Sequence, residues 1–229
     1  MVSFLLRVDA VLRQRDGAFA LAPARPRPDA RHLILIVLIF GAFYGAVLGS
    51  FRGIADDRAW QIVYAAVKVP LLLLATSAIA MPSFFVLNSL FGLRADFGAA
   101  VKALASAQAA LAIVLASLAP LTAVWYLSCA DYTMAVLFNA AMFAVASLAA
   151  QWLLRGTYRP LIRRNPKHRW MLWTWLVIYV FVGVQMGWIL RPFVGSEGIE
   201  VQFFREGAWG NAYVVVAGLI YKAIAGLAP

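Results

Sequence analysis

The sequence predicts an all-α integral membrane protein, and its composition and hydropathy pattern both exclude an ordinary soluble domain. Of its 229 residues, 64% are hydrophobic and 13% are charged, with a mean hydropathy of +0.82. Soluble domains are about half apolar and a quarter charged. The apolar residues form runs of about 20, the length that crosses a bilayer as a helix. We therefore expect residues 32–229 to form a bundle of about six transmembrane helices.

Residues 1–31 are expected to precede the bundle on the cytoplasmic surface. The apolar residues Phe4, Val8 and Val11 share one helical face, opposite Arg7 and Arg13. This pattern is typical of a short amphipathic helix that lies in the membrane interface. The proline-rich stretch 22–30 then joins this helix to the first span.

The spans follow from the apolar runs, which are expected at residues 33–51, 69–91, 103–127, 133–154, 170–190 and 209–227. The second run begins at residue 59 and is too long for one span. Proline favours the first turn of a helix, so we place the helix start near Pro70 and expect residues 59–68 to lie along the interface. The last run is the weakest because it opens with Gly210 and Asn211. Five spans and a re-entrant sixth segment are the alternative.

The orientation follows from the distribution of Lys and Arg, which mark the cytoplasmic side of a membrane protein. Fifteen of the 20 basic residues fall on one side of this topology and five on the other. We therefore predict a bacterial inner-membrane protein with both termini in the cytoplasm. The loop 155–169 has six basic residues and no acid, so it is expected to contact anionic lipid headgroups through Arg159, Arg163, Arg164, Lys167 and Arg169. Nucleic-acid binding is not expected.

Few charges fall inside the spans, which argues against a pump or a proton-coupled transporter. Lys68 is expected at the outer boundary, where its aliphatic stem lets the amine reach water. The amides Asn139, Gln185 and Asn211 should all lie in the outer half of the membrane. They either join helices by hydrogen bonds or line a polar vestibule.

Glycines repeat every four residues in two of the predicted spans. One ladder is Gly41, Gly45 and Gly49, and the other is Gly183 and Gly187. This spacing lets helix backbones approach closely. The ladders therefore predict either tight packing within the bundle or an interface with another membrane protein or a second copy.

The predicted outer loop, residues 191–208, is long and rich in aromatic residues next to charges. A simple connector would be shorter and more polar. The loop is either an aromatic anchor in the interface or a surface that docks a partner. Its candidate docking residues, with the span ends beside it, are Trp188, Arg191, Phe193, Phe203, Phe204, Arg205 and Trp209.

Catalytic and cofactor signatures are missing from the sequence. It contains no G-x-S-x-G, H-E-x-x-H or P-loop motif. Its single cysteine, Cys129, and its two histidines, His32 and His168, leave no metal-ligand or haem pattern. We therefore expect no enzyme, no cofactor and no metal, with a lipid-modifying enzyme as the alternative.

Residues 68–127 contain a span with proline, a Gly-Leu-Arg turn and a second span with a late proline, Pro120. This arrangement resembles the Yip-type multi-pass membrane proteins. With the motifs LRPFVGSEG and QFFREGAWGN, it also looks like an uncharacterised bacterial membrane protein family. The Yip-type resemblance implies a membrane adaptor without enzymatic activity.

Together these features favour a non-catalytic accessory subunit or scaffold that binds another membrane protein. The alternative is a channel or transporter for a small neutral or zwitterionic solute, with the three amides along its path.

Overall fold

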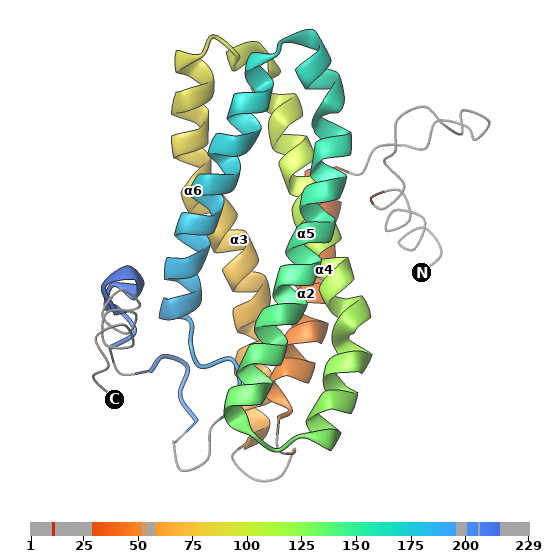
Figure 1. Cartoon of the computed structure of the whole chain (residues 1–229), viewed down its shortest axis with the longest axis vertical. Coiled ribbons are helices and arrows are strands. Elements are labelled where there is room, and N and C mark those ends of the chain that lie inside the picture. Colours follow the sequence, from red (N-terminus) through yellow and green to blue (C-terminus); the bar gives the residue numbers. More distant parts are fainter. Residues whose placement is uncertain are drawn as a thin grey trace, which may run out of the picture.

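The computed structural model describes Val11 and residues 29–51, 53, 58–195, 201–205 and 207–215. In this part of the chain, five long helices form the bundle in Figure 1, and all five are long and apolar enough to cross a membrane. They are α2 (Ala30–Gly49), α3 (Arg58–Leu90), α4 (Phe97–Ser128), α5 (Tyr132–Arg164) and α6 (Lys167–Ile189), with the short 3₁₀ helix η1 (Arg94–Asp96) between α3 and α4. The prediction of an all-helical bundle is confirmed for the described residues, and their five long apolar helices are compatible with a multi-pass membrane protein.

The helices pack as two antiparallel pairs joined by α2. Helix α6 packs against α3 and α5 against α4, while α2 contacts both α3 and α4. In Figure 1 the connections from α3 to α4 and from α5 to α6 lie together at the top, which we call the turn end. The α4–α5 connection and the segment after α6 lie at the bottom, which we call the cap end.

Helix α4 packs closely between α2 and α5 because its side chains are small. Its buried residues include a long series of alanines, such as Ala103, Ala107 and Ala110. Small residues let neighbouring helices approach closely where lipid supplies no hydrophobic drive for association. One core cluster forms around α2 and α4, and a second, built on Phe84, Tyr158 and Trp175, fills the turn-end half.

The expected break near Pro70 is wrong. Helix α3 continues from Arg58 to Leu90 with Pro70 and Pro82 inside it. A transmembrane helix tolerates an internal proline because neighbouring groups compensate for the lost hydrogen bond. Here Pro70 also packs against Gly41 of α2. This tertiary contact favours a continuous helix at a position where the local preference of proline favours a helix start.

The expected loop at residues 155–169 is also mostly helical. Helix α5 continues to Arg164, and the actual turn is limited to Asn165 and Pro166. Apolar residues keep helical spacing through this stretch, and Leu154, Tyr158 and Leu161 are buried. The helix therefore carries the basic residues on its exposed faces.

The start of the sixth predicted span is helical at residues 212–215. Asn211 acts as its N-cap, because its side-chain oxygen accepts the backbone N–H groups of Tyr213 at 2.9 Å and Val214 at 3.4 Å. The remainder of that span lies outside the described residues. So does the predicted amphipathic helix within residues 1–31, apart from Val11, which is helical and buried.

Candidate functional site

The cap end is closed by residues 190–195 and 201–205, which we call the cap segment. Two side chains of α3 hold it through backbone carbonyls. The Lys68 amine donates to the Pro192 oxygen at 2.8 Å, and the Gln61 amide donates to the Phe193 oxygen at 3.0 Å. The predicted outer loop is therefore attached to the bundle by hydrogen bonds, at residues far from it in sequence.

Lys68 is fully buried, so the expectation that its amine reaches water is wrong. Its amine lies 5.0 Å from the centre of the Phe203 ring and 6.0 Å from that of Tyr64, and 0% of the residue is exposed. Aromatic faces attract cations. The cap segment thus covers this charge with the Pro192 carbonyl and the Phe203 ring, and Tyr64 of α3 adds a second ring.

The aromatic residues of the predicted docking loop form a series of ring contacts. Tyr64 of α3 meets Phe203 at 5.4 Å, Phe203 meets Phe204 at 4.9 Å, and Phe204 meets Trp209 at 6.0 Å. Exposure rises along the series, to 42% at Phe204 and 79% at Trp209. The series therefore begins at Tyr64 of α3 and ends at the exposed Trp209.

Arg191 lies directly over Trp188, with its guanidinium carbon 3.3 Å from the ring centre. The backbone N–H of Arg205 donates to the Arg191 carbonyl at 3.3 Å, so the two arginines lie side by side in the cap segment. Burial, and to a smaller extent the positive charge of Arg205, lowers the pKa of the Arg191 guanidinium from its ordinary value. Phe193 contributes its carbonyl to Gln61 and packs against the core.

The three amides of the predicted vestibule fall into two groups. Asn139 donates to the Tyr126 hydroxyl at 2.5 Å and accepts from the Tyr44 hydroxyl at 3.4 Å, so it joins α5 to α4 and α2. Gln185 donates to the Gly210 carbonyl at 3.0 Å and accepts from the Ala212 N–H at 3.1 Å, next to Asn211. Within the described residues, no hydrogen bond links the first group to the second.

The first glycine ladder contacts a neighbouring helix inside the bundle. A Cβ on Gly41 would lie 3.3 Å from Pro70, one on Gly45 would collide with the Ala65 carbonyl, and one on Gly49 would lie 2.7 Å from the Gln61 carbonyl. This ladder therefore packs α2 onto α3. The second is less crowded, since a Cβ on Gly183 would meet Thr76 at 3.5 Å and one on Gly187 would meet nothing within 4 Å.

The turn end contains an ionic cluster that sequence reasoning missed. Asp96 accepts from Arg164 at 2.6 Å and lies 3.3 Å from the Nε2 atom of the buried His168. These residues come from η1, α5 and α6, and their separations in sequence offer no local signal of the contact. The five predicted lipid-contact residues are all exposed here, namely Arg159, Arg163, Arg164, Lys167 and Arg169.

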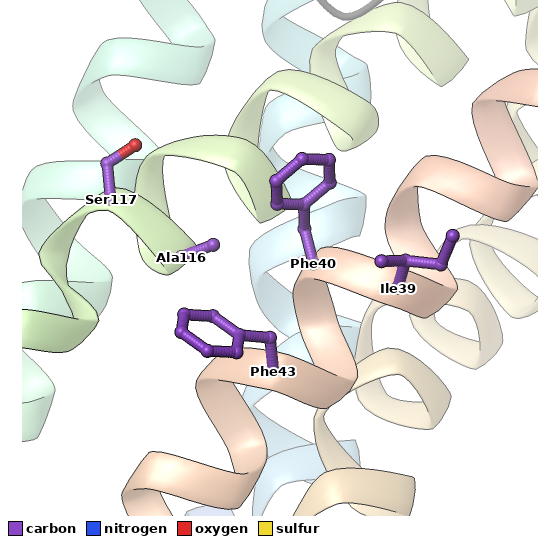
Figure 2. A pocket seen from close by; sticks show the side chains of 5 residues that line it. All are labelled: Ile39, Phe40, Phe43, Ala116 and Ser117. Carbon is purple, nitrogen blue, oxygen red and sulfur yellow. The ribbon is translucent and has the colours of Figure 1, made fainter. Parts of the chain in front are cut away.

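A shallow apolar groove of about 370 Å³ lies between α2 and α4. Figure 2 shows Phe40 and Phe43 of α2 lying opposite Ala116 and Ser117 of α4. The Ser117 hydroxyl donates to the Ile113 carbonyl at 2.9 Å. Since its one polar side chain already has a partner, the groove suits an apolar chain better than a polar solute.

No protein-family model, curated protein or solved structure matches this chain. Its function is therefore argued from its own residues.

Proposed function

We propose that this protein is a non-catalytic accessory subunit or scaffold of a bacterial inner membrane, and that it binds another membrane protein at the cap end. The observation that carries the proposal is the anchored aromatic series that ends at Trp209, 79% exposed. Aromatic and arginine residues dominate the binding energy of protein interfaces when they are held in place. The ring contact between Tyr64 and Phe203 joins this series to α3, and the hydrogen bonds of Lys68 and Gln61 hold residues 192 and 193 of the cap segment on the same helix.

The proposal includes six spans with both termini in the cytoplasm. Gly210 and Ala212 contact Gln185, and the next residue, Tyr213, stacks at 4.6 Å on Phe181, one turn back along α6. Contacts that move backward along α6 as the chain advances indicate an antiparallel course. In this proposal the apolar sequence that follows forms a sixth span. Fifteen basic residues on one side of the membrane and five on the other assign the first side to the cytoplasm.

The hydrogen bonding of Asn139 favours the scaffold over a transporter. Its amide is committed to Tyr126 and to the Ala135 carbonyl, and its oxygen to Tyr44. Amides that join helices in this way stabilise packing. The resemblance to Yip-type adaptors agrees with a scaffold and stays a prediction.

The test is purification from the native membrane into nanodiscs, followed by mass photometry and peptide identification. We expect a stoichiometric second membrane protein with the unaltered chain, and a loss of at least about tenfold in its recovery when Phe204→Ala and Trp209→Ala are combined. The matched control is Trp170→Ala, which removes a tryptophan 72% exposed on α6 near the turn end. Equal recovery with the cap variant and the control, or no second protein at all, would contradict the proposal.

A further inference from the structure

One residue of the N-terminal part of the chain belongs to the core of the bundle. Val11 is helical and 0% exposed. It is a member of the core cluster that also contains Ile36 of α2 and Ala110 of α4. The rest of this part, residues 1–10 and 12–28, lies outside the described residues. Val11 therefore shows where this part of the chain meets the bundle.

The burial of Val11 differs from that of valines on the lipid-facing sides of the bundle. A valine on a helix face that is open to lipid keeps much of its surface exposed, as Val145 of α5 does at 47% and Val177 of α6 at 65%. A helix that lay only in the membrane interface would leave its apolar residues open in the same way. The burial of Val11 therefore indicates packing on the protein.

The sequence before Val11 offers an apolar face for such packing. Phe4, Val8 and Val11 share one side of a helix, because residues three and four apart lie above one another. Leu6 is two residues from both Phe4 and Val8, so it falls on the other side. Amphipathic helices bury an apolar stripe of this kind against a neighbouring element. We therefore expect Phe4 and Val8 to contact the same part of the bundle as Val11.

The bundle has an apolar surface beside the core cluster that contains Val11. The groove of about 370 Å³ between α2 and α4 is lined by Phe40, which packs against that cluster. Ile39 and Phe43 lie on the α2 side of the groove (Figure 2), and they are 47% and 53% exposed. The core cluster and the groove therefore form one continuous apolar surface on α2 and α4.

The connection between Val11 and α2 is long enough to reach any point on this surface. It consists of residues 12–28, and Asp29 then forms the N-cap of α2. At about 3.3 Å per extended residue, this connection spans roughly 50 Å. Helix α2 itself is about 30 Å long. The groove and the core cluster are therefore both within reach.

We propose that residues 4–11 pack their apolar face on α2 and α4, with Val11 in the core cluster and Phe4 and Val8 at the groove. The N-terminal segment is then part of the bundle and closes this face to lipid and to other membrane helices. The proposal does not rest on the scaffold function, which concerns the cap end.

The experiment is photo-cross-linking of the full chain in nanodiscs, with p-benzoylphenylalanine in place of Phe4. We expect a cross-link within one chain to residues 33–43 of α2 or 109–117 of α4, identified by peptide mass spectrometry. The control carries the same photoreactive residue in place of Leu6, on the other side of the helix. It should give far less of this product.

A second measurement tests the burial of Val11. Val11→Asp should lower the thermal midpoint by about 5 °C, because it buries an unpaired carboxylate. Leu6→Asp is the matched control and should stay within about 2 °C of the unaltered chain. If Val11→Asp does not fold, Val11→Ala should lower the midpoint by about 3 °C, and the cross-link leaves Val11 unchanged.

Three results would overturn the proposal. Cross-links from position 4 to lipid alone would place the segment in the membrane interface. Cross-links between two chains, visible as a dimer on a denaturing gel, would assign the groove to a second copy. Equal thermal midpoints of Val11→Asp and Leu6→Asp would show that Val11 is not buried in the core. Neither measurement involves the protein partner, so this proposal and the scaffold function can fail separately.

Discussion

The two ends of the bundle hold their helices together by different contacts. At the turn end, a carboxylate pairs with two basic side chains, since Asp96 contacts both Arg164 and His168. At the cap end, the basic residue Lys68 donates to a backbone carbonyl and lies against aromatic rings. One end therefore joins its helices through ionic contacts, and the other through a backbone carbonyl and aromatic rings.

The difference follows from the length of the connections. Short turns, such as Asn165 and Pro166, bring the ends of α4, α5 and α6 to one point, so a single carboxylate reaches partners on two other elements. The segment after α6 contacts α3, and the Pro192 and Phe193 carbonyls of this segment accept from the side chains of Lys68 and Gln61.

The largest expected effect concerns the first glycine ladder, which packs α2 onto α3. Gly45→Leu should destabilise the bundle by about 3 kcal/mol, because a side chain there collides with the Ala65 backbone and forces α2 away from α3. Thermal unfolding in detergent measures the change. Gly187→Leu is the control and should stay within about 0.5 kcal/mol, since its Cβ meets nothing within 4 Å. Equal destabilisation by Gly45→Leu and Gly187→Leu would show that the first glycine ladder is not closely packed.

A smaller effect is expected from the buried amine that holds the cap segment. Lys68→Ala should cost about 2 kcal/mol, because it leaves a gap and removes the donor from the Pro192 carbonyl. Limited proteolysis should then cut the chain near residues 192–205 faster than before. Lys102→Ala, at an exposed position of α4, provides the control. Unchanged proteolysis in the Lys68 variant would mean that other contacts hold the cap segment.

The smallest effect separates Asp96 at the turn end from Asp131 at the cap end. Asp96→Asn should cost about 1 kcal/mol, because Arg164 and His168 lose a charged partner while the shape stays the same. Asp131→Asn should be neutral, since asparagine caps a helix as well as aspartate does. Thermal midpoints of the two variants in the same detergent give the comparison. Similar losses would contradict the ionic account of the turn end.

Hydropathy predicted the helices well because a long apolar run has few alternatives inside a bilayer. The described helices α2, α4 and α6 lie close to the spans expected at residues 33–51, 103–127 and 170–190. The two errors came from reading local signals in isolation. Pro70 was treated as a helix start and the basic residues after 154 as a loop, whereas packing against Gly41 and burial of Tyr158 continue both helices.

Some contacts at the cap end involve residues that the sequence predicts as a docking surface, and that role stays a prediction. The aromatic residues 203, 204 and 209 were singled out from composition, and their ring contacts are present in the structure. The partners of that segment on α3, Gln61 and Lys68, were not found, because more than 120 residues of chain separate them from Pro192 and Phe193. The pairing of Asp96 with His168 was not predicted either, because 72 residues separate them in the chain.

The sequence by itself determined that the described residues form long helices apolar enough to span a membrane, because apolar length depends on local composition. Only the tertiary structure decided which polar groups are buried and which have hydrogen-bond partners. It buried Lys68 under the cap segment, joined Asn139 to two other helices, and left Arg191 on Trp188 without an acceptor in the described residues. The physical reason is that a hydrogen bond depends on distance in space, and residues far apart in the chain meet only when the helices pack.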